Sequence, residues 1–170
     1  MLNWRDMAET LVYTKSAARS EIYAEVMPQI RALVAGESDL TANLANIAAV
    51  LKEALSFFWI GFYRIAGDQL VLGPFQGPVA CTRIRKGEGV CGHAWAEESI
   101  IIVPNVDEFP GHIACSSDSR SEIVVPIYDD RGRIWGVIDA DSDKLADFDE
   151  SDAEGLRQVA EIVTGLTSAQ

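Results

Sequence analysis

The chain has 170 residues, of which 48% are hydrophobic and 24% are charged, and its formal net charge is -12. This balance is typical of one folded domain and excludes a disordered chain, while the negative charge disfavours nucleic acid or an anionic membrane as a partner. No apolar run approaches the roughly 20 residues of a membrane helix. Residues 1–10 lack the basic and apolar blocks of a secretory signal, so we expect a cytoplasmic protein.

Helical periodicity marks segments near both ends of the chain. Apolar residues recur at helical spacing between residues 21 and 34 and again between residues 44 and 55, and a third stripe runs from Leu156 to Leu166. We therefore predict N-terminal helices within about residues 1–55 and a C-terminal helix over about residues 149–167.

Between these helices the pattern changes to short β-branched and aromatic runs separated by glycine, proline and aspartate. The runs cover residues 57–65, 69–75, 100–103, 122–128 and 133–140. Residues 129–132 are typical of a hairpin turn, so the last two strands should be antiparallel, and Pro126 indicates a sheet edge or a bulge. A short helix is expected over residues 90–97. The sequence predicts an α+β fold, with one domain over residues 1–170 and its sheet and pocket at about residues 56–142.

The first strand predicts a pocket wall. Alternation places Trp59, Gly61 and Tyr63 on one face, and the glycine between two aromatic side chains leaves room for a ligand. The alternative is that a neighbouring helix packs close to Gly61. The opposite face is predicted to carry Phe58, Ile60 and Phe62.

Three acidic residues are predicted to lie close together, where one of the last two strands begins and the other ends. Asp139 and Asp141 lie two positions apart, hence on one face, and Glu122 begins the neighbouring strand. A surface location is the simple alternative in a chain with 26 acidic residues, but Asp139 directly follows an apolar run. Carboxyl groups crowded at an apolar wall tend to keep a proton, because burial and like charge both raise the pKa. Such a group donates a hydrogen bond to a substrate oxygen.

The three cysteines, Cys81, Cys91 and Cys115, lie among glycine, proline and small polar residues rather than within apolar runs. Reactive thiols need partial access and positive potential, and Cys91 would lie in the first turn of the short helix, where the dipole favours a thiolate. In a reducing compartment all three are expected as free thiols at rest. A zinc site built from these cysteines with His93 and His112 is an alternative, but the long gaps disfavour it. Otherwise both histidines are expected as exposed loop residues, with His112 orienting the loop of Cys115.

Six motifs carry a family pattern, namely residues 59–63 (WIGFY), 73–77 (GPFQG) ahead of Cys81, 87–92 (GEGVCG), 109–115 (FPGHIAC), 121–124 (SEIV) and 136–142 (GVIDADS). Together they closely resemble the free methionine-R-sulfoxide reductases, which are enzymes built on the GAF fold. The resemblance extends from about Gly36 to the end of the chain.

The resemblance implies a central antiparallel sheet with helices on one face and a ligand pocket on the other. It implies an enzyme that reduces free methionine-R-sulfoxide and is recycled by thioredoxin, with no cofactor and no metal. Cys115 is then the nucleophile, and Cys81 and Cys91 are candidates for resolving it. The implied substrate contacts are Trp59, Tyr63, Glu122, Asp139 and Asp141. The sequence shows no interface and leaves a homodimer open.

The chemistry of a sulfoxide supports this reading. Its sulfur becomes a good electrophile only when the oxygen is protonated or hydrogen-bonded, which requires a thiolate on one side and a protonated carboxyl on the other. Glu122 with Asp139 or Asp141 would supply the proton, and the remaining carboxylate and the backbone N–H groups of residues 113–116 would hold the ends of a free amino acid. The sulfenic acid that forms is trapped by a second thiol. The alternative function is a sensor or binding module that captures a small molecule in the same pocket without turnover.

Overall fold

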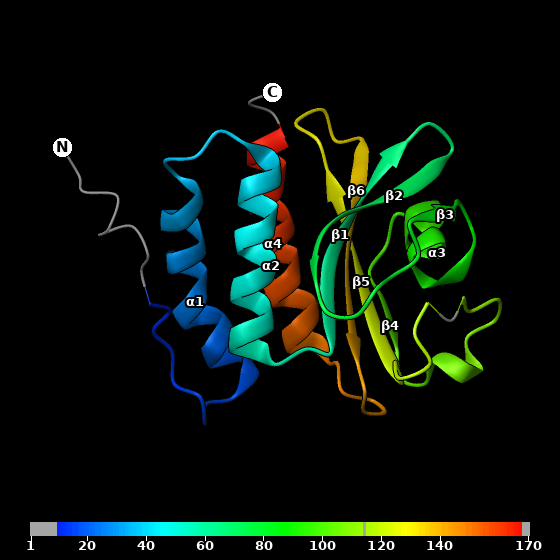
Figure 1. Ribbon diagram of the computed structural model, residues 1–170, viewed down its shortest axis with the longest axis horizontal. Coiled ribbons are helices and arrows are strands. Elements are labelled where there is room, and N and C mark those ends of the chain that lie inside the picture. Colours follow the sequence, from blue (N-terminus) through cyan, green and yellow to red (C-terminus); the bar gives the residue numbers. More distant parts are fainter. Residues whose placement is uncertain (1–9, 114, 168–170) are drawn as a thin grey trace.

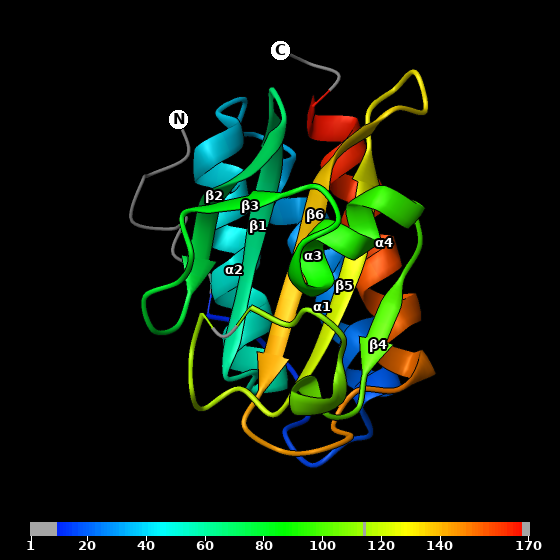
Figure 2. The same ribbon diagram turned by 90° about the vertical axis from the view of Figure 1, so that its right-hand side faces the viewer.

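The computed structural model describes residues 10–113 and 115–167. In chain order its elements are α1 (Arg19–Val34), α2 (Leu40–Leu55), β1 (Trp59–Ala66), β2 (Gln69–Gln76), β3 (Arg83–Arg85), α3 (Gly89–Glu97), β4 (Ile101–Val103), the 3-10 turn η2 (Val106–Glu108), β5 (Ser121–Tyr128), β6 (Ile134–Ser142) and α4 (Glu150–Thr167). The six strands found in these residues form one antiparallel sheet in the order β3-β2-β1-β6-β5-β4. Helices α2 and α4 cover one face, α1 packs on the outer side of these two helices, and α3 lies over the other face of the sheet (Figures 1 and 2).

This architecture confirms the predicted α+β class and its antiparallel sheet, and two details differ from the prediction. The sequence does not predict β3, because this strand of three residues contains a single apolar side chain, Ile84. Helix α3 packs on the pocket side of the sheet rather than with the other helices. Its buried residues Val90, Ala94 and Trp95 give this short helix an apolar stripe of its own, which joins the cluster on that side.

The larger apolar core lies between the sheet and helices α2 and α4, and it extends to α1, which packs on those two helices. Ile60, Phe62 and Ile138 project from β1 and β6 into this core and are fully buried. Burial of each such side chain stabilises the fold by roughly 1.5–3 kcal/mol. Helix α2 starts at a defined point because the carboxylate of Asp39 accepts a hydrogen bond from the Ala42 N–H at 2.8 Å. The strands that carry the pocket are therefore anchored from behind.

The predicted hairpin at residues 129–132 is present and joins β5 to β6. Pro126 of β5 lies opposite Val137 of β6. On the other side of β5, strand β4 pairs only with residues 122–124, so in the described part of the chain it leaves Pro126 without a neighbour there. A proline lacks the N–H that a central ladder position requires. The prediction that Pro126 marks a sheet edge is confirmed.

A charged network ties α1 and α4 to the end of β6. Arg19 of α1 contacts Asp147 at 2.9 Å and Asp152 of α4 at 2.8 Å. Ser142, the last residue of β6, donates a hydrogen bond from its hydroxyl to Asp147 at 2.6 Å. The strand end that carries Asp141 is therefore fixed from the helix side of the molecule.

Two sequence predictions concern the ends of the chain. The segment in which no secretory signal is expected, residues 1–10, is described only at Thr10, and the predicted domain extent of residues 1–170 stays a prediction. None of the helices in the described part of the chain combines the length and the apolar character that a bilayer crossing requires.

Candidate active site

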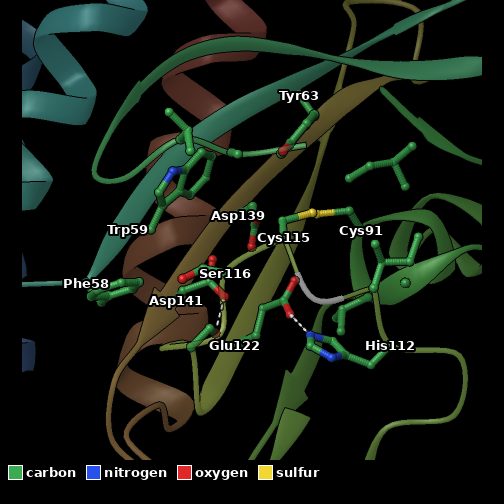
Figure 3. A pocket seen from close by; sticks show the side chains of 17 residues that line it. Phe58, Trp59, Tyr63, Cys91, His112, Cys115, Ser116, Glu122, Asp139 and Asp141 are labelled. Atoms are coloured by element: carbon green, nitrogen blue, oxygen red, sulfur yellow. Dashed lines mark hydrogen bonds and ion pairs between the residues drawn. The ribbon is translucent and has the colours of Figure 1, made fainter. Parts of the chain in front are cut away.

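A cavity lies on the sheet face opposite to the one that α2 and α4 cover (Figure 3). Residues of β1, β5 and β6 line it from the sheet, and α3 together with the segments at residues 79–80, 112–113 and 115–119 closes it from the other side. The lining side chains that could bind a ligand or take part in a reaction are Trp59, Tyr63, Cys91, His112, Cys115, Ser119, Glu122, Asp139 and Asp141. The structure thus gathers the predicted site residues around one space, and Cys81 is attached to it through Cys115.

Strand register explains why the acids meet. Glu122 of β5 lies directly opposite Asp141 of β6, and Asp139 lies two positions away on the same strand. On the other side of β6, Trp59 and Gly61 of β1 lie opposite Asp141 and Asp139. Directly opposed residues of an antiparallel pair point to the same face. The two aromatic residues of β1 and the three carboxyl groups therefore share one surface.

The space beside Gly61 is filled by protein rather than by a ligand. A Cβ at this position would lie 2.5 Å from both the Cβ of Phe75 and the ring of Trp59. The Trp59 ring stacks on Phe75 at 5.2 Å and on Tyr63 at 6.1 Å between centroids. The prediction of an open hole here is wrong, and the close neighbour is not a helix, as the alternative supposed, but Phe75 of β2 together with the Trp59 ring. Gly61 lets the tryptophan ring lie flat against the sheet as the wall of the cavity.

Phe58 also differs from its predicted place. It precedes β1, which starts at Trp59, and it lines the cavity instead of facing the helices. The alternation of strand faces does not apply to a residue that lies outside the strand. Its neighbour Phe57 packs in the helix-covered core instead.

Burial raises the pKa of all three carboxyl groups, and repulsion between them adds to the rise at Glu122 and Asp139. Burial and the charges of Asp139 and Asp141 raise the pKa of Glu122 well above its usual range. Burial and the charge of Asp141 do the same to the pKa of Asp139. Burial raises the pKa of Asp141 to about 6, while the hydroxyl of Ser119, which donates to its Oδ1 at 2.5 Å, opposes that rise. The cluster therefore holds protons near neutral pH, as the sequence predicts.

Among the described residues that line the cavity, no lysine or arginine side chain balances the charge of the cluster. One acceptor, Oδ1 of Asp139, is buried and has no hydrogen-bond partner within the described structure. A buried acceptor without a donor is costly, so this atom is arranged to receive a cation or a proton donor from outside the chain.

The two histidines are not exposed loop residues as expected. His93 lies within α3, where its Nδ1 is 2.6 Å from the Gly89 carbonyl oxygen. His112 lines the cavity with its Nε2 at 3.9 Å from Oε2 of Glu122, and its side chain is 15% exposed (Figure 3). Burial lowers the pKa of His112. It is thus a further polar group facing the carboxyl cluster.

The cysteines divide into a bonded pair and a buried thiol. Cys81 and Cys115 form a disulfide across a sequence separation of 34 residues, with Cα atoms 5.3 Å apart. This bond differs from the expected free thiols at rest, and it removes two thiolates from the alternative zinc set. Cys91 is free and buried.

The predicted thiolate at Cys91 is wrong. The helix is present and Cys91 lies in its first turn, but burial, and then the charge of Asp139, raise the pKa of the thiol well above its usual value. A helix dipole favours a nearby anion by roughly 0.3–1 kcal/mol. Removing a charge from water costs several kcal/mol, so burial outweighs the dipole.

Comparisons with known proteins agree with this geometry. The family model of the GAF domain matches residues 39–165. The crystal structure of free methionine-R-sulfoxide reductase from Neisseria meningitidis in complex with its substrate is 54% identical, covers 94% of this chain and 96% of its own, and superposes with a TM-score of 0.91. The free methionine-R-sulfoxide reductase of Escherichia coli is 46% identical over 83% of this chain and 86% of its own length. That of Saccharomyces cerevisiae is 37% identical over 92% and 91%.

The chain belongs to the free methionine-R-sulfoxide reductase family. The resemblance drawn from its motifs is confirmed, and the matched region contains every predicted site residue, from Trp59 to Asp141. The curved sheet, with α3 packed on its cavity side, is the GAF fold of this family.

Two hydrogen bonds of this family member escape sequence reasoning. The indole Nε1 of Trp59 donates to the Pro78 carbonyl at 3.1 Å, and the hydroxyl of Tyr63 donates to the Cys81 carbonyl at 2.8 Å. The aromatic wall therefore fixes the segment that carries Cys81. Nothing in the local sequence connects a strand tyrosine to a carbonyl 18 residues further along the chain.

The predicted carboxylate cradle at residues 113–116 is only partly described. Ala114 lies outside the described residues. The N–H of Cys115 donates to the Ile113 carbonyl at 3.0 Å, so this donor is already engaged. The cradle stays a prediction for the remaining N–H groups.

Proposed function

We propose that this chain reduces free L-methionine-R-sulfoxide to L-methionine, with Cys115 as the nucleophile and Cys81 as the thiol that resolves it. The observation that carries the proposal is the disulfide between these residues beside a cavity lined with carboxyl groups. The relatives from Neisseria meningitidis, Escherichia coli and Saccharomyces cerevisiae support the same reaction.

The first step transfers oxygen from substrate to enzyme. The thiolate of Cys115 attacks the sulfoxide sulfur while a protonated carboxyl donates to the sulfoxide oxygen. The sulfur–oxygen bond breaks, methionine leaves, and Cys115 becomes a sulfenic acid, so the substrate is reduced by two electrons and the thiol is oxidised by two. Glu122 is the proposed donor, because its raised pKa keeps a proton available near neutral pH.

The second step closes the disulfide. The thiol of Cys81 attacks the sulfenic sulfur, the new bond forms, and the oxygen leaves as water. A thioredoxin-type dithiol then exchanges with the disulfide and restores both thiols. The reaction therefore needs no organic cofactor and no resident metal. Cys91, which stays free in the disulfide form, remains a candidate for a later thiol exchange.

The remaining groups of the cavity suit a free amino acid. Asp141, whose pKa of about 6 leaves it ionised at neutral pH, offers a negative charge to the substrate ammonium, and the unpartnered Oδ1 of Asp139 offers a further acceptor. The Trp59 ring, with Tyr63 behind it, offers an apolar wall for the S-methyl group. A methionine sulfoxide within a polypeptide lacks the ammonium, which accounts for selection of the free amino acid. A cytoplasmic location and a homodimer belong to the proposal as well.

Single-turnover chemistry tests the proposal. Reduced protein mixed with one equivalent of L-methionine-R-sulfoxide, without added reductant, should release about one methionine per chain and form the disulfide between Cys81 and Cys115, as seen by mass spectrometry. Cys115→Ser should release none, since a serine hydroxyl is too weak a nucleophile at neutral pH. Cys81→Ser is the matched control, because it should release methionine once and retain a sulfenic acid. A full equivalent released by Cys115→Ser would overturn the assignment.

A sensor with the same fold behaves differently. It would bind the sulfoxide without consuming thiols, whereas the proposed enzyme oxidises a thioredoxin or dithiothreitol pool in step with the R epimer and hardly at all with the S epimer. Tight binding without thiol loss would favour the sensor.

A further inference from the structure

We propose that Cys91, Asp139 and Glu122 form a binding site for a zinc-like divalent cation, and that its occupation blocks the cavity. The site is distinct from the zinc set considered from the sequence, because it excludes the disulfide pair. The blocking effect rests on the proposed function, whereas the binding itself does not.

The three donors are already gathered from separate elements. The Sγ of Cys91 in α3 and one carboxylate oxygen each from Asp139 in β6 and Glu122 in β5 lie within 4.8 Å of one another, and all three residues are buried. Donor atoms around a tetrahedral zinc ion lie about 3–4 Å apart, given metal bonds of roughly 2.0–2.3 Å. Small rotations of side chains therefore complete the site without movement of the strands.

A separate observation points to a cation here. Oδ1 of Asp139, only 7% of whose residue surface is exposed, has no hydrogen-bond partner in the described structure. Asp141 adds a third carboxyl group, and in the described part of the chain no lysine or arginine lines the cavity. A divalent ion would give the orphan oxygen a ligand bond, displace the protons that the crowded carboxyl groups hold and balance the negative charge that their ionisation leaves.

The donor set selects the type of metal. A thiol among carboxylates favours zinc and similar transition metals, since calcium and magnesium prefer oxygen donors alone. The Nε2 of His112, 3.9 Å from Oε2 of Glu122, is a candidate for a fourth ligand. Imidazole again suits zinc rather than calcium.

The redox pair takes no part in this site. Cys81 and Cys115 are joined to each other, so in the disulfide form the one free thiol of the chain is Cys91. The site should therefore bind metal in the disulfide form of the protein. In that form a metal ion cannot act by binding the thiols of Cys81 and Cys115, because these are joined to each other. Because Asp139 and Glu122 also serve the proposed substrate site, metal and substrate should exclude each other.

The test uses Co²⁺ as a spectroscopic probe on the disulfide form of the full chain. Titration should yield one Co²⁺ per chain with the charge-transfer absorption of a cobalt–thiolate bond, and Zn²⁺ should abolish that absorption by displacement. Cys91→Ser should remove the absorption and weaken Zn²⁺ binding at least about tenfold. Asp139→Asn and Glu122→Gln should weaken Co²⁺ binding. The Co²⁺ that still binds should show the cobalt–thiolate absorption, because both variants keep the thiol of Cys91. Asp118→Asn is the matched control, because it removes one exposed carboxylate outside the cavity and should bind as the wild type does.

Several outcomes overturn the inference. Absence of the thiolate absorption in the disulfide form refutes the site, and so does equal Zn²⁺ binding by Cys91→Ser, Asp139→Asn and Asp118→Asn. The carboxylate variants keep the test valid if Cys91→Ser fails to fold. Zn²⁺ binding that leaves the affinity for L-methionine-R-sulfoxide unchanged refutes the blocking effect alone. A protein that turns over but binds no metal refutes this inference and leaves the proposed function intact.

Discussion

The two faces of the sheet are built from the same strands and have opposite chemistry. Ile123, next to Glu122, and Ile138, next to Asp139, are fully buried among the helices on one face. Their acidic neighbours line the cavity on the other face. Because successive strand residues point to opposite sides, a step of one residue separates packing from chemistry.

The two faces also differ in what they contribute to stability. Each large apolar side chain on the helix-covered face stabilises the fold by roughly 1.5–3 kcal/mol. On the cavity face, burial and mutual repulsion raise the pKa of Glu122 and Asp139, and each unit of such a rise corresponds to about 1.4 kcal/mol of disfavoured ionisation. The carboxyl cluster therefore lowers the free energy of unfolding at neutral pH. A role in stability does not explain these buried acids, whereas a role in binding or catalysis does.

Glu122→Gln should separate most clearly what the cavity face contributes to the reaction from what it contributes to stability. The variant loses the proposed proton donor, so the rate of methionine release should fall by about 10²–10⁴-fold. Its free energy of unfolding should stay equal or increase, because a neutral amide replaces a buried acid beside two others. Stopped-flow release of methionine and urea denaturation check both expectations. Near-normal activity would move the donor role to Asp139 or Asp141.

Ile138→Ala should show the reverse behaviour. Truncation of this fully buried side chain on the helix-covered face should lower the free energy of unfolding by about 2–5 kcal/mol. Methionine release per folded molecule should stay close to the wild-type value at a temperature where the variant is folded. Loss of activity without loss of stability would contradict the division between the faces.

The strand alternation is what made much of the site predictable. It depends only on local backbone geometry, so Trp59 and Tyr63 were assignable to one face of their strand, and Asp139 and Asp141 to one face of theirs, without knowledge of the fold. That the two pairs share a face follows from the pairing of β1 with β6. Glu122 joins them through the hairpin turn, which is itself a local signal.

Long-range packing decided the rest. Two features follow from how α3 and the loops fold onto the sheet. One is the pairing of Cys81 with Cys115. The other is the burial of Cys91, which raises the pKa of its thiol although the helix dipole at this position favours a thiolate. The contact of Ser119 with Asp141 joins a loop to a strand end 22 residues away, which no local pattern encodes. Gly61 was ambiguous for the same reason, since only the packed structure shows which neighbour fills its space.

Asp141→Asn should change how stability depends on pH. The pKa of Asp141 is about 6 in the folded chain against an ordinary value of 3.8, so the folded state binds this proton more tightly than the unfolded state. The contribution is present at low pH and is lost as the pH rises from about 4 to about 6, by about 3 kcal/mol. The variant should lose that part of the decline, whereas Glu122 and Asp139 still act in the same direction.

Urea denaturation of both proteins across this pH range measures the difference, with Asp118→Asn as a control that should follow the wild type. Parallel curves for Asp141→Asn and the wild type would mean that Asp141 titrates normally.

Tyr63→Phe should have the smallest effect and the most specific one. The variant keeps the ring that stacks on Trp59 and removes the hydroxyl that donates to the Cys81 carbonyl at 2.8 Å. Because one hydrogen bond contributes about 1 kcal/mol, formation of the disulfide should slow roughly fivefold while the first release of methionine is unchanged. Trapping of the sulfenic acid with dimedone during a single turnover measures the delay.

Tyr128→Phe is the matched control, since its hydroxyl donates to the Glu98 carbonyl at 2.9 Å and an equal chemical change there should leave disulfide formation unaltered. A raised KM with normal disulfide formation in Tyr63→Phe would instead make Tyr63 a substrate contact. In that case the aromatic wall would serve the first chemical step rather than hold the segment that completes the second.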